Sequence, residues 1–550
     1  QLLQPPGSII AQSDGIDGIS TGFLDRDQQG TASSFNYNYW SSPVSPGMDN
    51  ADYSVGAVMM DGTDPLPVGL SFQYGYHYAD GAASSPRKVS TFWLHRFLGT
   101  ANNYFEWDWI GAEEPLKVGE GYSMKGTSGW AAISAPQNYT FRGIPNNDEI
   151  VLDMFASGES TVAVNYLVGN PYPSAISIEK FINDNTTTDP SFNGTVYFWD
   201  HFAGSTHYLE LYIGGYAAAN KVGGVSSASS VDSRINNNNQ NSYKTKPGLY
   251  IPVSQGFFVT NVTSYNADGS PANITPGKTI KFNNNQRIFQ KEETSKSIFY
   301  SQEKKSLQSA QSDDADLNEG LKIWLKFKSP QGYHRQILVG ADPEATEGFD
   351  IGYDAPLMDN IPEDMYWFFN ENQFVIQGVP DFSLDRELSL GIKVAEIGEL
   401  SISIDELMNI PDHMNIYIKD ANRKVIHNLR DGEYVTQSKK GVFTDRFKIV
   451  FKDETAVVID PEEPEEPALE TGPVEIIYFK DTREILIKNP ELVEIQEVFI
   501  NNLLGQQVEA YYEIPKERRI PLPVKRFSSG VYLVKLQTEK GVVIKKIILE

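Results

Sequence analysis

The chain contains 550 residues, which is too many for one ordinary hydrophobic core, so we expect three or four domains. Its formal net charge of -26 argues against nucleic acid or anionic membranes as partners, because both bind to basic surfaces. The absence of cysteine excludes disulfides, thiolate metal sites and cysteine catalysis.

The amino-acid usage favours β-structure. Glycine (44), proline (31), tyrosine (28) and phenylalanine (29) are frequent, which is typical of many short strands joined by turns. The sequence therefore predicts an all-β fold of tandem β-sandwich domains, Ig-like or jelly-roll-like. There is no run of about 18 apolar residues, so no transmembrane helix is predicted. The chain starts at Gln1 without a secretion leader, and we expect a mature form or the C-terminal part of a larger protein.

Residues 1–290 are predicted to form a β-rich surface module, with two pseudo-repeated halves. Aromatic and glycine-containing strands at 39–43, 91–97 and 118–124 are followed by a similar series at 169–173, 197–202 and 253–259. The spacing of the two series is about 130 residues. A duplicated β-unit explains this order; chance repetition in a chain rich in tyrosine and tryptophan is the alternative.

This first region also holds most of the tryptophans, which have two interpretations. Flat rings can stack on pyranose faces, with Asn and Asp side chains to orient the sugar. They can equally fill the core of a sandwich, which is the more frequent use. For the glycan interpretation we single out Trp93 and Trp199, from a set that also includes Tyr37, Tyr39, Trp40, Trp107, Trp109 and Trp130.

Catalytic motifs are weak. The pattern Gly-Ile-Ser-Thr-Gly at 18–22 has the letters of a nucleophile elbow, but acidic, loop-like residues flank it where a buried strand and a helix are required. The seven histidines form no HExxH pair and no closely spaced metal cluster. No pair of carboxylates can be assigned to glycosidase chemistry from the sequence. We therefore expect a protein that is not an enzyme and has no cofactor.

Structural calcium is the one metal for which the sequence offers weak candidates. One acidic segment has the alternate spacing of a calcium loop, but its glycine comes one position late and Leu325 stands where a bidentate Glu is required. The candidate ligands are Asp314, Asp316 and Asn318 in that segment, and Asp14, Asp17, Asp25 and Asp27 near the start. A solvated linker is the better interpretation of the first group.

Two segments of unusual composition divide the rest of the chain. Residues 291–319 are polar and predict a linker or loop, and residues 454–472 are rich in Pro and Glu, which predicts an extended linker. Between them, residues 320–453 predict a β-sandwich. Its hairpins join 321–327 to 333–340, 366–369 to 374–376, and 415–418 to 424–426.

Residues 473–550 end in a predicted hairpin whose last strand alternates basic and apolar residues. The first strand covers 530–536, Glu539–Gly541 form the turn, and the second strand runs from Gly541 to Glu550. A chain that ends on such a strand presents a terminus suited to recognition or pairing.

This segment resembles the type A C-terminal sorting domain of the type IX secretion system of Gram-negative Bacteroidota. The resemblance rests on the order of four pieces at 485–489, 498–508, 529–532 and 545–549, which end in Lys-Lys-Ile-Ile-Leu. It implies a domain that the outer-membrane translocon and a shuttle β-barrel recognise, and that is later exchanged for a surface anchor such as lipopolysaccharide. The residues assigned to recognition are Asn501, Gly505, Gln506, Gly530, Tyr532, Lys545, Lys546, Ile547, Ile548 and Leu549.

The segment before it resembles β-modules of large flavobacterial surface proteins of the gliding-adhesin type, through 335–340, 345–350 and 441–447, and earlier through 169–174, 255–259 and 282–284. The resemblance implies location, without a chemical activity. We therefore expect a secreted or cell-surface modular protein, an adhesin, that crosses the outer membrane by the type IX route. The alternative is an exported protein that binds or degrades polysaccharide.

Overall fold

The computed structural model describes two compact units, Gln1–Ala456 and Val457–Glu550, and each is considered by itself. In the first unit the described residues are 22–80, 83–100, 104–132, 135–154, 163–203, 206–208, 213–230, 246–265, 271–274, 278–289, 320–359 and 361–452. In the second they are 474–479, 484–489, 491–502, 507–512, 514–517, 519–523, 530–539 and 541–549. The predicted linkers at 291–319 and 454–472 lie outside these ranges.

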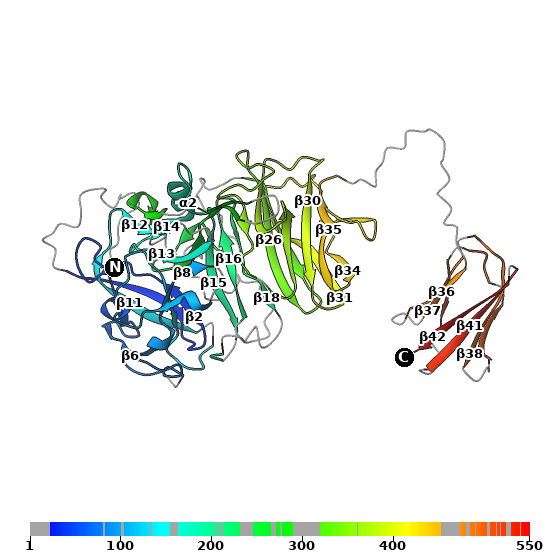
Figure 1. The fold of residues 1–550 in the computed structure, drawn as a ribbon, viewed down its shortest axis with the longest axis horizontal. Helices are drawn as coiled ribbons and strands as arrows, with labels where there is room; N and C mark the ends of the chain where they lie inside the picture. Colours follow the sequence, from blue (N-terminus) through cyan, green and yellow to red (C-terminus); the bar gives the residue numbers. More distant parts are fainter. Residues whose placement is uncertain are drawn as a thin grey trace. The chain divides into compact units, whose positions relative to one another are not determined.

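The first unit consists mainly of strands (Figure 1). A five-stranded sheet has the order β1 (Leu24–Thr31), β11 (Pro136–Pro145), β4 (Met59–Asp61) and β5 (Val68–Gly69), with β3 (Val44–Ser45) paired to β11. A nine-stranded sheet has the order β17 (Gly224–Val225), β16 (Ile213–Ala219), β15 (Val196–Ala203), β20 (Gly256–Thr260), β13 (Val164–Gly169), β8 (His95–Thr100), β10 (Tyr122–Lys125) and β2 (Tyr37–Trp40), with β9 (Trp107–Trp109) paired to β8.

Smaller sheets and short helices complete this N-terminal part. The sheets pair β12 (Ile150–Asp153) with β23 (Thr279–Phe282), β14 (Ala175–Ser177) with β19 (Tyr250–Ile251) and β24 (Arg287–Ile288), β21 (Val262–Tyr265) with β22 (Pro271–Ile274), and β6 (Ser71–Gln73) with β7 (Lys88–Ser90). The helices are α1 (Val55–Val58), α2 (Ile178–Thr186) and the 3-10 turns η1 (Thr91–Trp93), η2 (Tyr104–Glu106) and η4 (Asn284–Gln286). Ser177 caps α2, since its hydroxyl accepts a hydrogen bond from the Lys180 amide.

A twelve-stranded sheet makes up most of residues 320–452. Its order is β33 (Val425–Asn428), β32 (Tyr417–Asp420), β35 (Gly441–Val450), β30 (Glu387–Val394), β28 (Asp364–Phe369), β29 (Asn372–Val379), β26 (Tyr333–Ala341), β25 (Lys322–Lys328), β31 (Gly398–Met408) and β34 (Tyr434–Ser438), with β18 (Ser229–Ser230) on β26 and β27 (Ala355–Pro356) on β29. The three hairpins predicted here are confirmed, as β25–β26, β28–β29 and β32–β33.

The strands of the two predicted halves of the first region occupy the nine-stranded sheet in the same order. In one half the order is β8, β10, β2, and in the other it is β15, β20, β13. The contacts between the halves are also reciprocal. The Ser41 amide donates to the Ser254 carbonyl at 2.9 Å, and the Gly169 amide donates to the Gly119 carbonyl at 2.9 Å.

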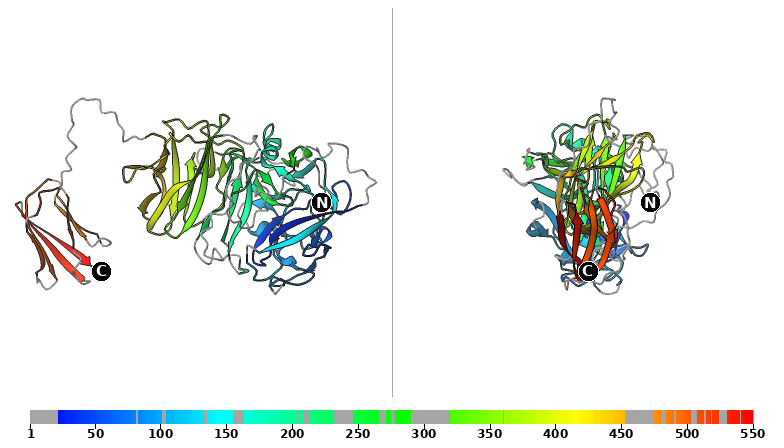
Figure 2. Two further views of the ribbon diagram at one scale, coloured as in Figure 1. Left: turned by 180° about the vertical axis from the view of Figure 1, so that it is seen from behind. Right: turned by 90° about the vertical axis from the view of Figure 1, so that its right-hand side faces the viewer.

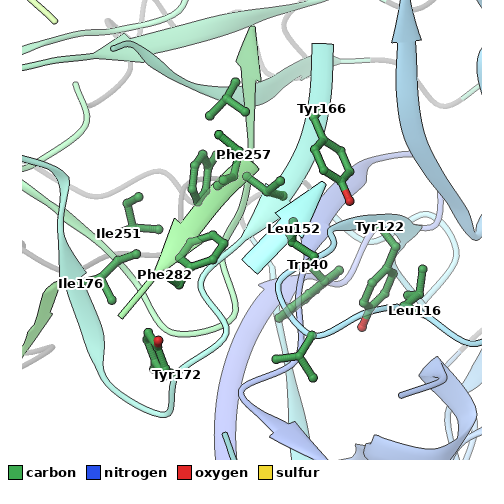
Figure 3. Packing of buried hydrophobic residues seen from close by; sticks show 14 of the residues in the cluster. Trp40, Leu116, Tyr122, Leu152, Tyr166, Tyr172, Ile176, Ile251, Phe257 and Phe282 are labelled. Carbon is green, nitrogen blue, oxygen red and sulfur yellow. The ribbon is translucent and has the colours of Figure 1, made fainter. Parts of the chain in front are cut away.

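Among the described residues of the first unit, three large hydrophobic clusters and one small cluster, around Ala228 and Ile361, form its cores. One lies within the N-terminal part, where Trp40, Tyr122, Tyr166 and Phe257 are buried together (Figure 3). A second lies within residues 320–452. The third is shared, because Tyr197 and Phe258 pack in one cluster with Trp324 and other residues of the later segment. Figure 1, and the view from behind in the left part of Figure 2, show the cyan and green strands of the N-terminal part beside the yellow-green strands of residues 320–452.

The second unit is a sandwich of two antiparallel sheets. One sheet has the order β36 (Glu475–Phe479), β37 (Glu484–Lys488) and β40 (Arg519–Pro523), and the other has the order β39 (Gln507–Tyr512), β38 (Ile495–Asn502), β41 (Gly530–Thr538) and β42 (Gly541–Leu549). Alternate residues of both sheets enter one core, among them Ile487, Ile500 and Val534. The prediction of an all-β chain with sandwich domains is confirmed.

Candidate functional sites

The final strand, β42, closes one side of the four-stranded sheet in the second unit. It pairs with β41 over its whole length, from Gly541 opposite Thr538 to Leu549 opposite Gly530. Among the described strands β42 is the last in this sheet, so its other edge faces no strand. Successive side chains of a strand point to opposite faces, and β42 therefore has a core face and an outer face.

The core face of β42 carries Val543, Lys545 and Ile547. Ile547 is only 5% exposed and belongs to the core of the unit, and Val543 packs against that core. In the folded domain Ile547 thus faces the core, and its predicted apolar contact with the export machinery stays a prediction. Lys545 lies on the same face by alternation, yet its side chain is exposed.

The outer face of β42 carries Val542, Ile544 and Lys546. Val542 is 52% exposed and Ile544 is 59% exposed, and Lys546 is also exposed. The sequence prediction missed Val542 and Ile544, although a period of two counted from Ile547 would have placed both on the open face.

The other predicted recognition residues lie in different surroundings. Tyr532 is buried in the core of the second unit, and Asn501 is half-buried near the end of β38. Gly530 begins β41, while Ile548 and Leu549 belong to β42. Gly505 and Gln506 lie outside the described residues. The structure thus gathers Asn501, Lys545 and Lys546 on the β38–β41–β42 sheet.

Trp93 and Trp199, the rings predicted to stack on glycans, are used within the fold. Trp93 is 4% exposed, its indole N–H donates to the Tyr76 carbonyl, and the His207 ring stacks on it at 5.1 Å between centroids. The prediction of a sugar-stacking role for Trp93 is therefore wrong, because a sugar has no access to the covered ring. Trp199 is half-buried and stacks on Tyr39 at 6.2 Å.

A different set of rings is exposed in the N-terminal part. Tyr74 is 66% exposed and Trp109 is 52% exposed, with 6.0 Å between their ring centroids. Phe92 lies 5.7 Å from Tyr74, and the exposed Tyr76 lies 6.4 Å from Phe92. We call these four residues the aromatic cluster. The Trp109 indole donates to the Thr91 carbonyl at 2.7 Å, which fixes that ring in place.

Next to the aromatic cluster, three polar side chains are linked in a row, of which Lys125 is buried and His207 and Asp80 are partly buried. The Lys125 amine is 2.9 Å from Nδ1 of His207, and Nε2 of His207 is 2.9 Å from both carboxylate oxygens of Asp80. With its proton on Nε2, His207 accepts from Lys125 and donates to Asp80. The amine also lies 3.5 Å from the centre of the Trp93 ring.

Burial shifts the pKa values of Lys125 and His207. Burial lowers the pKa of Lys125 to about 6, although the Asp80 carboxylate opposes the shift. Burial and the nearby Lys125 also lower the pKa of His207, against the effect of its hydrogen bond to Asp80. Lys125 is 3% exposed. A substrate therefore cannot reach the Lys125 amine. We conclude that Lys125, His207 and Asp80 support the rings of the aromatic cluster.

Two of the metal-binding candidates from the sequence, Asp25 and Asp27, lie in the described part of the chain. Among the described residues no group of three or more His, Cys, Asp or Glu side chains could hold a metal ion. Asp25 forms a bidentate ion pair with Arg142, and Asp27 accepts a hydrogen bond from Thr140. Asp14, Asp17, Asp314, Asp316 and Asn318 lie outside the described residues, as does most of the serine pattern at 18–22. No helix in the described part of the chain is long and apolar enough to span a membrane.

Comparison with known proteins identifies both units. Residues 3–451 match a family described as a domain of unknown function, DUF8693, which covers well over half of the chain. The chain belongs to the DUF8693 family. Residues 480–550 match the secretion system C-terminal sorting domain. This DUF8693 protein is thus a type IX secretion cargo, exported across the outer membrane to the cell surface or the extracellular space, and its sorting domain interacts with the type IX machinery.

The other comparisons add little to this identification. No curated protein matches the chain. A solved structure titled "Biofilm associated protein - BSP domain" has 8% sequence identity and a TM-score of 0.16 over 100% of this chain and 99% of that chain. At this TM-score the likeness carries no argument about fold or function.

Proposed function

We propose that this DUF8693 protein is a non-enzymatic adhesin, with residues 22–452 as its ligand-binding unit. The observation that carries the proposal is the aromatic cluster on the unit that the sorting domain delivers outside the cell. Large exposed rings grouped on one surface are typical of binding sites, because they bring much apolar area at a small cost in conformational entropy.

The adhesin proposal is tested by comparing the binding of cells to surfaces. The variant replaces Tyr74 and Trp109 by Ser, and the control replaces Phe289, which is an exposed aromatic residue outside the cluster, by Ser. We expect the double variant to reduce adhesion about tenfold and the control to leave it unchanged. Equal adhesion of the two strains, at equal surface amounts of the protein, would contradict the proposal.

Polysaccharide binding is the second candidate, and one feature of the cluster favours it. The cluster consists only of aromatic side chains, and the exposed polar residues Gln73 and His77 adjoin Tyr74 and Tyr76 in the sequence. Pyranose faces dock on such rings while neighbouring polar groups bind the hydroxyls. Binding of the purified chain to a glycan array, lost in the Tyr74→Ser and Trp109→Ser double variant, distinguishes a glycan ligand from a protein ligand. Release of new reducing ends would instead show a polysaccharide-degrading enzyme.

The same proposal covers the later steps of export. The sorting-domain resemblance supports binding by a shuttle β-barrel and exchange of the sorting domain for a lipopolysaccharide anchor. It also supports a Bacteroidota source, and the resemblance of the earlier segments to flavobacterial surface proteins of the gliding-adhesin type supports a role of the adhesin in gliding motility. Deletion of Lys545–Glu550 tests the role of the C-terminal segment as the sorting signal. Export at the normal level would contradict this role.

A further inference from the structure

The outer face of the four-stranded sheet in the sorting domain is unusually apolar. A sandwich normally points polar side chains outward and apolar ones inward. Here the outer face carries six apolar side chains that are exposed or half-exposed, namely Phe499, Val508, Tyr512, Leu533, Val542 and Ile544. They come from all four strands of the sheet.

The strand register places these residues in rows across the face. One row runs Ala510, Phe499, Lys535, Ile544, the next runs Tyr512, Glu497, Gln537, Val542, and a third runs Gln507, Asn501, Leu533, Lys546. The Phe499 and Tyr512 rings contact at 6.3 Å between centroids. Cross-strand neighbours on one face lie close together, so the apolar groups form one surface.

The charges on this face have an excess of basic groups. Lys535 and Lys546 lie on it, against the single acidic residue Glu497 in the three rows. The chain as a whole has a net charge of -26. A basic, apolar face within an acidic protein fits a partner surface that has apolar side chains and a carboxylate.

Lys545 indicates that the face, rather than the edge of β42, makes the contact. Its position on the core side places a charge inward on the edge strand, and inward-pointing charges are a device by which edge strands avoid pairing with other strands. Addition of a strand along β42 would bury this ammonium group. Docking on the outer face leaves it in water.

We propose that the outer face of the β39–β38–β41–β42 sheet is the surface by which the sorting domain docks on the type IX export machinery. Val542, Ile544 and Phe499 supply the apolar contact, and Lys535 and Lys546 pair with carboxylates of the partner. The occupant is a component of the machinery, because the sorting-domain family establishes that interaction and β42 belongs to this face.

The experiment measures export of the full chain in the bacterium that produces it. In the double variant Val542→Ser and Ile544→Ser, we expect the surface-exposed fraction, detected by external protease, to fall about tenfold. The matched control replaces Leu384 and Ile397, two exposed apolar residues of the first unit, by Ser. Both purified variants should keep the melting behaviour of the wild type, because the replaced side chains are exposed. Normal export of the first variant overturns the proposal.

A pair of charge reversals separates face from edge. Lys546→Glu should reduce export several-fold, while Lys545→Glu, one residue away on the other face, should reduce it less than about twofold. Equal losses would favour strand addition and overturn docking on the face. A wild-type dimer that the Val542→Ser and Ile544→Ser change converts to monomers, without a loss of export, would show that the face binds a second copy and would also overturn the proposal.

Discussion

Lys125 shows how a charged residue in the first unit is adapted to burial. Its amine is enclosed by Trp93, Tyr37 and His207, and the nearest carboxylate, Asp80, is reached through the imidazole. The low pKa of Lys125 means that burial costs more than the attraction of Asp80 returns. A charged Lys125 amine therefore lowers the free energy of unfolding. The favourable contribution of this side chain is its contact with the rings.

This arrangement predicts a particular dependence of stability on pH. The pKa of Lys125 is about 6 in the folded chain and near its ordinary value of 10.5 in the unfolded chain. Between these values the unfolded chain binds one more proton, so the free energy of unfolding rises with pH, by up to about 1.4 kcal/mol per pH unit. In Lys125→Met we expect this slope to be smaller by up to about 1.4 kcal/mol per pH unit between pH 7.5 and 9, which corresponds to the one proton that the unfolded wild type binds in excess. Urea unfolding of the first-unit transition across that range measures it.

The control for this prediction is Lys117→Met, which removes an exposed lysine. Its slope should equal that of the wild type. His207 does not disturb the comparison, because its pKa is lowered from 6.5 and it is neutral in both states above pH 7.5. A Lys125→Met slope equal to that of the wild type would show that Lys125 is charged in the folded chain.

The role of individual rings could not be predicted from the sequence. Trp93 and Trp109 lie in similar aromatic contexts, but one is covered by His207 and Lys125 and the other is open. The covering residues are far from Trp93 in the sequence, and only the fold brings them there. The presence of an aromatic surface was therefore a reasonable hypothesis, whereas the identity of its members depended on long-range contacts.

At the scale of elements, the period of strands made most of the fold predictable. The hairpins at β25–β26 and β41–β42 follow directly from alternating residues around a turn. The face that each side chain takes is also set by this period, as in β42. The period of a strand does not predict which strand, distant in the sequence, pairs with it. The pairing of β13 with β8 is an example.

One ion cluster connects strands that the sequence treats as separate. Arg335 on β26 binds both carboxylate oxygens of Asp364 at 2.7 and 2.8 Å, and it contacts Asp359 at 3.1 Å. Asp359 also accepts a hydrogen bond from the Tyr216 amide of β16 at 2.8 Å. Burial disfavours the charge of Arg335, but the two carboxylates outweigh it and raise its pKa. The cluster thus joins the twelve-stranded sheet to the nine-stranded sheet.

Loss of this arginine should be costly. Arg335→Met leaves two buried carboxylates without their counter-charge, and we expect the free energy of unfolding of the first unit to fall by about 3–5 kcal/mol. Denaturant unfolding measures the change. Arg142→Met removes the exposed bidentate pair with Asp25, and should cost less than about 1 kcal/mol. Similar losses in the two variants would mean that the buried cluster contributes no more than a surface ion pair.

At the scale of the whole molecule, the chain has two units with separate cores. The first unit unites residues on both sides of 290–319 through a shared cluster that includes Phe258 and Trp324. The core of the second unit contains residues of that unit alone. A sorting domain with its own core can be recognised or removed without exposing the apolar interior of the first unit.

This division predicts two separate thermal transitions in calorimetry. Ile500→Val removes one buried methylene from the second unit, at a cost of about 0.5–1.5 kcal/mol, and should lower only the transition of that unit, by about 4–8 °C for each kcal/mol. Arg335→Met should lower only the other transition. If either substitution moved both transitions equally, the units would unfold together, and the sorting domain could not be released without destabilising the first unit.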